Sequence, residues 1–326
     1  MVNRQRQEFP VEHLEQKHVD LSLPFPNDSS FFYGGDKAGN AFITRMAFRG
    51  NNRAHEYWFD FYLKGIGFIG MKDDPGADGE GFQMGNLKWE PVTIGKQWRI
   101  TYSGPLKGEG NIVYDTKVDL IFTGEHPIYN YAGSSDRNLI AKAMASEKWT
   151  RDFFFKLKEL SQVHLEQTGN IKGTIVIDGK EIKLDLRAMK DHTFGSRTWL
   201  TWDRHYWISG LSDKGYQWTV TTIRYQFLGR LSAGFVIDPE GHVDAIVDCT
   251  NLEEISKQKL LPDKGSVDLK MKSGKSHHFE FTRNGHFPYV MDKKYLMFEA
   301  IGSYKFDGDD GLGMVEFGFN ADTYKP

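Results

Sequence analysis

The stretch KDHTFGSRTWLTWDRHYWISG, residues 190–210, combines side chains that can transfer protons with a high density of aromatic rings. It contains Asp191, His192 and Arg197 together with three of the chain's eight tryptophans. Such charged groups are costly to bury unless they are paired, so their density predicts an organised hydrogen-bond network. A functional pocket and a structural latch with aromatic packing are both consistent with this composition.

The order of residues within this stretch limits which side chains can act together. Asp191 and His192 are adjacent, and adjacent side chains of a β-strand point to opposite faces. They can form a dyad only if the backbone turns, and the Phe-Gly-Ser that follows offers such a turn. In the next strand, His205 and Trp207 would share one face while Tyr206 lies on the other.

The segments on either side have the alternating pattern of β-strands. Runs such as GTIVIDG and EIKLDLRAM are rich in β-branched residues, and turns recur about every 8–12 residues. The sequence VIDGKEI predicts a hairpin with Asp178-Gly179 at its turn. Antiparallel strands in closed or nearly closed barrels fit this pattern, because closure removes exposed strand edges. A single large sandwich is the alternative.

Residues 134–170 interrupt the β pattern and predict one long helical segment, about 136–166. The segment contains no proline, and its first glycine is Gly169, just beyond the expected helix end. His164 would lie on the apolar face of this helix, and a break near Ser146 is left open. The residues that can cap the start of the helix are Ser134, Ser135 and Asp136.

Composition excludes several classes of protein. The 326 residues carry a net charge of −3, which gives no electrostatic attraction to nucleic acid. The single cysteine excludes an internal disulfide, and the start of the chain has no apolar signal-peptide core. No run approaches the roughly 20 apolar residues that a membrane span needs. We therefore expect a cytoplasmic globular protein.

Other motifs in the chain have simpler explanations. Residues 65–70, GIGFIG, match a dinucleotide-binding fingerprint, but the turn-rich sequence that follows predicts a strand and a turn instead of the required helix. The acidic loops at residues 72–81 and 306–313 lack the ligand pattern of an EF-hand and predict solvated hairpin loops. We therefore expect neither a metal ion nor a cofactor. Histidines that lack partners at metal-ligand spacing are His277, His278 and His286.

The order of residues in MKDHTFGSRTW resembles the D-H-S-W-G-x-R-D-W signature of the tandem lipocalin-like family. That family includes carotenoid 1,2-hydratases, kievitone hydratase and fungal decalin-forming Diels–Alderases. A closer resemblance is to the non-kinase domain of animal phosphoenolpyruvate-synthase-like (rifampicin-phosphotransferase-like) proteins. It is carried by FFYGGDKAGNAFITRMAFR, by MASEKWTRDFFFKLKELSQVHLEQTGNIKGTIVIDGKEI and by the terminal GLGMVEFGFN. The resemblance runs from about Phe31 to Phe319, and no phosphotransferase motif accompanies it.

The resemblance implies two lipocalin-like barrels packed together, with a cavity for a lipophilic molecule. Residues 1–30 would form an irregular lead-in, residues 31–190 a first barrel with the helical insertion, and residues 191–326 a second barrel. The chain departs from the signature at three positions, where Ser, Trp or Tyr, and Asp are usual: Thr193, Phe194 and Thr198. The last change removes a carboxylate that could have paired with Arg197.

From the resemblance we expect an enzyme that acts on a lipophilic, unsaturated small molecule by cyclisation, isomerisation, or addition or loss of water. A buried Asp191 carboxyl would donate a proton, and His192 would orient it or relay the proton. Glu316 is a second candidate carboxylate, and Arg197 would hold a carboxylate in place. Aromatic residues that would bind the substrate and stabilise positive charge are Trp199, Trp202, Tyr206 and Trp207.

Two other functions fit the same residues. A non-catalytic carrier would store a hydrophobic ligand in the cavity, and the Asp-His motif would then be only a seam between the barrels. An interaction module without a small ligand is expected if side chains fill the barrel interior.

Overall fold

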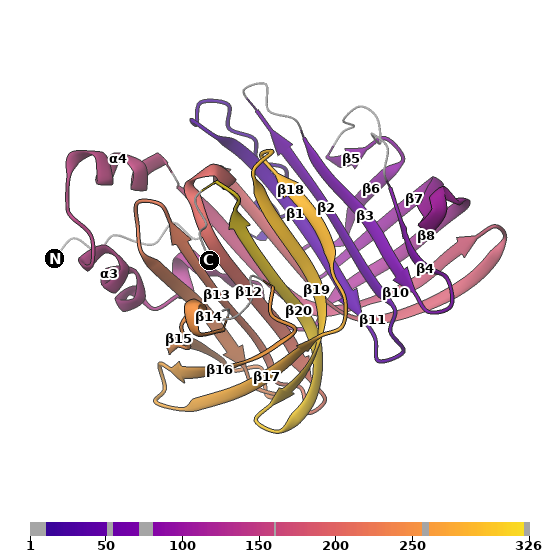
Figure 1. Ribbon diagram of the computed structural model, residues 1–326. Coiled ribbons are helices and arrows are strands. Elements are labelled where there is room, and N and C mark those ends of the chain that lie inside the picture. The colour runs from indigo at the N-terminus through magenta and orange to yellow at the C-terminus, as the bar shows by residue number, and fades with distance from the viewer. Residues whose placement is uncertain (1–10, 51–54, 72–80, 160, 256–260, 323–326) are drawn as a thin grey trace. The chain divides into compact units, whose positions relative to one another are not determined.

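A computed structural model describes residues 11–50, 55–71, 81–159, 161–255 and 261–322 (Figure 1). The chain forms two compact units. Unit 1 comprises Met1–Gly133 and Val163–Gly195, and unit 2 comprises Ser134–Gln162 and Ser196–Pro326. Each unit contains one closed barrel of eight antiparallel strands, which confirms the predicted tandem barrels in place of a single sandwich.

The barrel of unit 1 has the strand order β4-β3-β2-β1-β11-β10-β8-β7 and closes where β4 pairs with β7 (Figure 1). Its strands are β1 (Pro26–Gly35), β2 (Ala41–Arg49), β3 (Glu56–Leu63), β4 (Gly67–Gly70), β7 (Gln97–Gly108), β8 (Val113–Gly124), β10 (Gln162–Ile177) and β11 (Lys180–Ser196). The sheet continues beyond β7 into β6 (Leu87–Thr93) and β5 (Phe82–Met84), and β9 (Tyr129–Asn130) pairs with β10. Short helical elements are α1 (Val11–Leu14), η1 (Glu109–Asn111) and α2 (Tyr131–Ser134).

Alternation along the strands decides which side chains fill this barrel. Trp98 and Ile100 of β7 are buried in the core, while Arg99 between them is exposed and pairs with Asp119 at 2.6 Å. One face of the sheet therefore lies on the core and the other faces solvent. Most of the core is aromatic and aliphatic, and its largest members include Phe32, Phe42, Phe59, Trp89, Trp98 and Phe122.

Two local predictions are confirmed in unit 1. Asp178 and Gly179 form the turn between β10 and β11 with φ angles of 48° and 81°, as a two-residue hairpin of this sequence requires. GIGFIG at residues 65–70 is a turn followed by strand β4, not the start of a helix. The acidic loop at residues 72–80 lies outside the described residues.

The barrel of unit 2 has the order β17-β16-β15-β14-β13-β12-β20-β19 and closes where β17 pairs with β19. Its strands are β12 (Trp202–Ser212), β13 (Gln217–Tyr225), β14 (Arg230–Ile237), β15 (Val243–Cys249), β16 (Lys264–Met271), β17 (Ser276–Arg283), β19 (Tyr295–Phe306) and β20 (Asp309–Asn320). β18 (Phe287–Met291) pairs with β19 only, and two short elements complete the unit, η2 (Trp199–Thr201) and α5 (Leu252–Ile255). The core again consists of interior-facing residues, among them Tyr206, Ile208 and Trp218.

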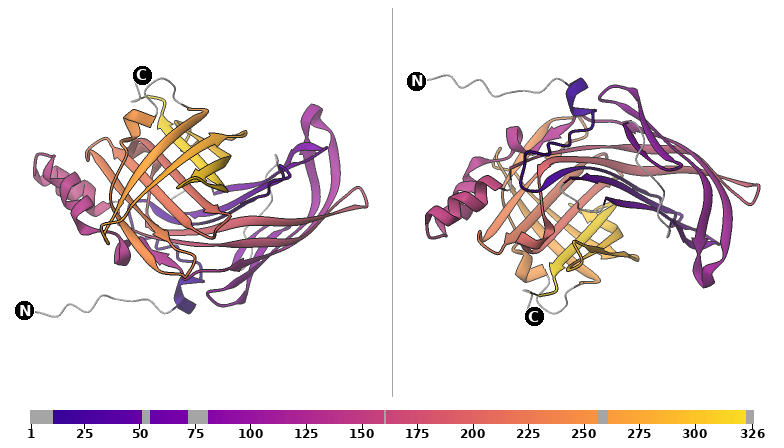
Figure 2. Two further views of the ribbon diagram at one scale, coloured as in Figure 1. Left: turned by 90° about the horizontal axis from the view of Figure 1, so that it is seen from below. Right: turned by 90° about the horizontal axis from the view of Figure 1, so that it is seen from above.

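The predicted long helix is shorter than expected and is broken. α3 (Arg137–Ala145) and α4 (Arg151–Glu159) lie outside the barrel of unit 2, where α3 contacts β14 and β15 (Figure 2). Asp136, one of the three residues predicted as a cap, accepts a hydrogen bond from the Asn138 N–H at 2.8 Å. α3 ends at Ser146, where the sequence left a break open. No helix among the described residues is both long and apolar enough to cross a membrane.

The placement of His164 on a helix is wrong, because the chain is already a strand from Gln162. The Leu165 side chain is buried on one face of the strand, and the partly exposed His164 and the buried Glu166 share the other face. Leu165 and Glu166 pair with β9. The pairing replaces the helical hydrogen bonds that propensity alone favoured. Similarly, the expected lead-in over residues 1–30 is irregular only in part, since β1 begins at Pro26.

The division into units differs in position from the expected domain boundary. Residue 190 lies inside β11, and the chain passes from unit 1 to unit 2 after Gly195. The helices α3 and α4 belong to unit 2, although the sequence suggested an insertion in the first barrel. Asp191 and His192 are therefore in unit 1, whereas Arg197 and the tryptophans that follow it are in unit 2.

Candidate functional site

A hydrogen-bonded chain of ionisable side chains lies on one face of the β12, β19 and β20 strands of unit 2. The Tyr295 hydroxyl lies 2.5 Å from His205 Nδ1, and His205 Nε2 bonds to the Glu316 carboxylate. Burial, followed by the negative charge of Glu316, raises the pKa of Tyr295 well above its usual value, so its O–H stays intact. The Nε2–H of His205 donates to the Glu316 carboxylate.

The last member of this hydrogen-bonded series is a second carboxyl group, that of Glu299. Glu299 and Glu316 face each other across β19 and β20, and they share a hydrogen bond. A hydrogen bond between two carboxyl groups requires a proton on one of them. Glu299 is only 1% exposed, so bulk water does not reach its carboxyl group to form a hydrogen bond there.

Burial and the neighbouring groups shift the pKa of Glu316 in opposite directions. Burial alone would raise its pKa, but the charge of His205, the bonds from His205 and Glu299 and the charge of Arg197 outweigh burial. The pKa of Glu316 consequently lies below its ordinary value. The lowered pKa favours the ionised form of Glu316.

An arginine and two tryptophan rings adjoin this hydrogen-bonded series of side chains. The Arg197 guanidinium lies 4.1 Å from the ring centre of Trp199 and 5.0 Å from that of Trp202. Trp199 also stacks on Tyr295 with ring centres 5.4 Å apart. Arg197 is therefore held by two aromatic faces, and its charge helps to lower the pKa of Glu316.

The turn before β19 fixes the position of Trp199. The Asp292 carboxylate accepts from the Trp199 N–H at 3.0 Å and from the Thr198 hydroxyl at 3.2 Å. Thr198 in turn caps η2 by accepting from the Leu200 N–H. Thr198 stands where the signature usually has Asp. It holds η2 in place, and the carboxylate next to it comes from Asp292 instead.

Gly318 leaves space for the Tyr295 and His205 rings. A Cβ atom at this position would lie 2.5 Å from Tyr295 Cε1 and 2.6 Å from His205 Nδ1. Real Cβ atoms do not approach other heavy atoms so closely, so any larger residue must displace one of the rings. The lack of a side chain at residue 318 is therefore a condition for the Tyr295–His205 bond.

Asp191 takes part in a second network, which lies within unit 1. The Thr193 hydroxyl donates to Asp191 at 3.2 Å and lies 2.6 Å from His164 Nδ1. His164 Nε2 lies 2.8 Å from the Glu166 carboxylate, and Tyr131 packs edge-on against the imidazole. Burial, with the charge of Glu166 next, raises the pKa of Tyr131 well above its usual value.

His192 points away from Asp191, as adjacent strand residues must. Its Nε2 lies 2.9 Å from Asp28, and its ring packs edge-on against Phe82 inside unit 1. No Asp191–His192 dyad forms. Lys190 shares the inner face, 3.3 Å from Glu15, and burial lowers its pKa although the charge of Glu15 opposes that change.

The two remaining predicted site residues lie on different faces of β12. Tyr206 is part of the unit 2 core and donates its hydroxyl to the Thr250 carbonyl at 3.0 Å. Trp207 pairs across the sheet with Glu316 and so shares the face of the His205 chain. The predicted division between Tyr206 and the pair His205–Trp207 is confirmed.

Tyr295 and Glu299 were not predicted as site residues from the sequence, and neither was the role of His164. The first two lie about 90 residues from His205 in the chain, and only the pairing of β12 with β20 and of β20 with β19 brings them together. A signal for Tyr295 and Glu299 existed in their spacing, because residues four apart in a strand share a face.

Two sets of side chains have the composition of a metal site. They are His164 with Glu166 and Asp191, and Asp238 with Glu240 and His242. In the first set, both imidazole nitrogens of His164 already have partners, Nδ1 the Thr193 hydroxyl and Nε2 the Glu166 carboxylate. The second set is largely exposed.

The charge state of Glu316 predicts a pH dependence of stability. A carboxyl group with a lowered folded pKa binds fewer protons in the folded than in the unfolded chain, so stability rises with pH in that window. The stabilisation is complete above the ordinary glutamate pKa of about 4.3 and is lost as the pH falls through the lower folded value. We expect urea midpoints to fall less steeply below this point in Glu316→Gln than in the parent. Equal slopes in the parent, in Glu316→Gln and in the exposed control Glu280→Gln would contradict the assignment.

Comparisons with known proteins bear on the family and the fold. A family model described as a domain of unknown function, DUF7064, matches residues 12–321. A comparison with curated proteins found no match. None of the matches bears on the phosphoenolpyruvate-synthase-like resemblance, which stays a prediction.

Solved structures share the fold over nearly the whole chain. A Nitrosomonas europaea protein assigned as AttH has a TM-score of 0.57 at 12% identity, and the match covers 98% of each chain. Kievitone hydratase from Nectria haematococca has a TM-score of 0.52 at 10% identity, covering 93% of this chain and 92% of that one. CghA has a TM-score of 0.51 at 9% identity, covering 92% and 90%. At these identities, the similarities show that the chain shares the fold of the three proteins.

Proposed function

We propose that this chain, which belongs to the DUF7064 family, is an acid–base enzyme for a lipophilic, unsaturated small molecule, and that it works without a cofactor. The chemistry would be cyclisation, isomerisation, or addition or loss of water. The observation that carries the proposal is the buried chain Tyr295–His205–Glu316–Glu299. We infer that the two carboxyl groups of this chain share one transferable proton, which the His205 imidazole adjoins.

The two carboxyl groups would act in turn on a carbon–carbon double bond. The proton of the pair passes to one alkene carbon, and a water molecule forms its bond to the other carbon. A proton of that water then returns to the carboxylate pair, so the pair ends as it began. Dehydration is the same sequence reversed, and isomerisation replaces the addition of water by loss of a different proton. Proton transfer by positioned groups contributes roughly 10²–10⁴-fold in rate.

Arg197 and the tryptophans would position the substrate. We predicted that the Trp199 and Trp202 rings stabilise a developing cation, but Arg197 already lies over both of them. The guanidinium is then the group that meets a substrate oxygen, such as a carbonyl conjugated to the double bond. The rings would give the substrate an apolar surface, and orientation of this kind accelerates reactions strongly.

Asp191 is assigned a proton-transfer role through a different partner from the predicted one. His164 joins it to Glu166 by way of Thr193, so these four residues form a second relay. His164 is the member through which this relay meets solvent, since 21% of its side chain is exposed. The proposal is supported by two solved structures of the same fold, kievitone hydratase and CghA.

A non-catalytic carrier is the competing function, and burial of the network favours it. His205 and Glu299 are 2% and 1% exposed, which suits a structural latch as well as a dry active site. In the carrier, the same residues would hold strands together and no bond of the ligand would change.

Mass spectrometry can distinguish the two functions. The protein is incubated with a panel of unsaturated lipophilic compounds that includes kievitone, and each compound is followed for gain or loss of one water and for isomeric products. We expect at least one compound to be converted with multiple turnovers. A compound that binds in equal amount to the protein and is recovered unchanged would support the carrier instead.

A further inference from the structure

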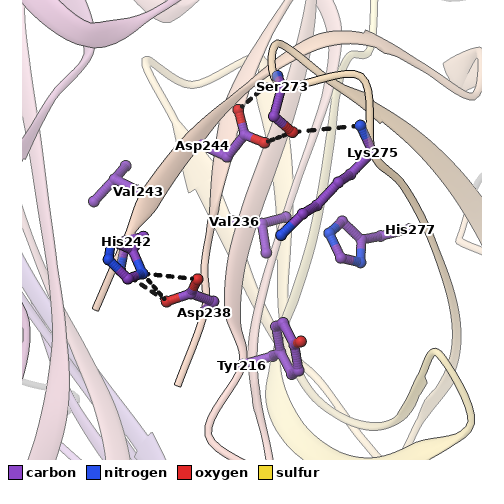
Figure 3. Close-up of a pocket in the computed structure, with 9 residues that line it drawn as sticks. All are labelled: Tyr216, Val236, Asp238, His242, Val243, Asp244, Ser273, Lys275 and His277. Carbon is purple, nitrogen blue, oxygen red and sulfur yellow. Dashed lines mark hydrogen bonds and ion pairs between the residues drawn. The ribbon is translucent and has the colours of Figure 1, made fainter. Parts of the chain in front are cut away.

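A pocket of about 330 Å³ lies at one end of the unit 2 barrel, and it shares no residue with the His205 chain (Figure 3). Three turns surround it: those between β12 and β13, between β14 and β15, and between β16 and β17. Its volume is at the lower end of the range for small-molecule sites, which begins at about 300 Å³.

The acidic groups at this pocket already have donors. Asp238 accepts from the backbone N–H of His242 at 2.8 Å and from its ring. Asp244 accepts from the Ser273 hydroxyl and N–H. Both carboxylates are therefore occupied in holding their turns, and little of their acceptor capacity is directed at a ligand.

The charged group that is left for a ligand is the Lys275 ammonium. Figure 3 shows the Lys275 side chain crossing the pocket, so that its nitrogen lies beside Val236 and next to His277. Within the described ranges of the chain, no carboxylate forms an ion pair with this ammonium. The two carboxylates keep their negative charge, and the Lys275 ammonium is the group of this pocket that can form an ion pair with an acid group of a ligand.

The floor of the pocket is aromatic and closed. Tyr216 and His277 both stack on Phe306, with ring centres 5.5 and 5.2 Å apart, and Trp218 stacks on Phe306 from the interior at 4.4 Å. The stack blocks passage into the barrel, so an occupant must be short. A flat ring can lie against Tyr216 and His277 while an acid group reaches Lys275.

We propose that this pocket binds a small aromatic carboxylate. The Lys275 ammonium pairs with the ligand's carboxylate, and its ring packs on Tyr216 and His277. His277 is oriented for this by its Nδ1, which bonds to Asp307 at 2.6 Å and leaves Nε2 facing the pocket side. The site is independent of the proposed catalytic chain, so either can exist without the other.

Calorimetric titration of the full chain with benzoate tests the proposal. We expect binding to one site, about tenfold weaker binding in Lys275→Met, and unchanged binding in Lys272→Met, which removes a charge from the same turn outside the pocket. Benzyl alcohol, which has the ring without the acid, should bind far more weakly than benzoate. Tyr216→Phe should retain most of the affinity, because the ring is kept.

Three results would overturn the proposal. The first is a parent protein that does not bind benzoate. The second is equal affinity in the parent and Lys275→Met, and the third is equal affinity for benzoate and benzyl alcohol. Circular dichroism of each variant shows that it is folded, and turnover of a compound converted by the parent should be unaffected by Lys275→Met.

Discussion

Glu316→Gln should abolish most turnover while leaving the fold intact. The glutamine carbonyl can still accept from His205 Nε2–H, and its amide can donate to Glu299, so the hydrogen-bond geometry survives. The amide cannot take up or release a proton under these conditions. We expect the rate of conversion to fall by about 10²–10⁴-fold, the contribution typical of a positioned acid or base.

A matched control separates this effect from a general loss of charge. Glu280 is an exposed carboxylate on β17 of the same unit, and Glu280→Gln should keep the parent's rate. Ligand binding should change little in Glu316→Gln, whereas the urea midpoint at neutral pH should fall, because the variant lacks the stabilisation that the ionised carboxylate supplies. If Glu316→Gln converted the compound as fast as Glu280→Gln, the carboxyl pair would have no part in the chemistry.

Gly318→Ala should have the second largest effect, because one methyl group cannot fit between the two rings above it. It would meet Tyr295 Cε1 at 2.5 Å and His205 Nδ1 at 2.6 Å. Relief of this overlap separates Tyr295 from His205 and costs about 1–3 kcal/mol of folding free energy, as is usual for overpacking. The broken bond should also lower turnover. Thermal unfolding and the conversion assay measure the two effects.

Gly285→Ala is the control for the loss of a glycine. Gly285 lies in the connection between β17 and β18, and a Cβ there would meet no atom within 4 Å. The variant should match the parent in both measurements. Tyr295→Phe, which removes only the hydroxyl, should reproduce the activity loss of Gly318→Ala without the overlap. Full activity in Gly318→Ala would show that the Tyr295–His205 bond is dispensable.

Local chemistry was enough to predict the class of fold. Strand alternation such as Trp98-Arg99-Ile100 shows a buried and a solvated face, and Asp178-Gly179 supplies the positive φ angles of a tight hairpin. Prediction failed at the residues after Glu159. There, the pairing of β10 with β9 overrides the helix propensity of the segment around His164.

The candidate site was predictable only in part, because most of its contacts join distant segments. Asp191, Arg197 and Glu316 were singled out from their types and their neighbours in sequence. Their partners could not be, since His164 reaches Asp191 through the pairing of two long strands, and Glu299 reaches Glu316 through the register of β19 on β20. A shift of one residue in that register would have turned Glu299 to the opposite face.

The most direct test of the proposed function is a comparison of single-turnover conversion by the parent and by Glu316→Gln in deuterated water. The compound is one that the parent converts, and the products are analysed by mass spectrometry. We expect the parent to incorporate deuterium at carbon when it adds water to the double bond or isomerises it, and Glu316→Gln to bind the compound but form product at least a hundredfold more slowly. Equal deuterium incorporation and equal rates in the two proteins would contradict it.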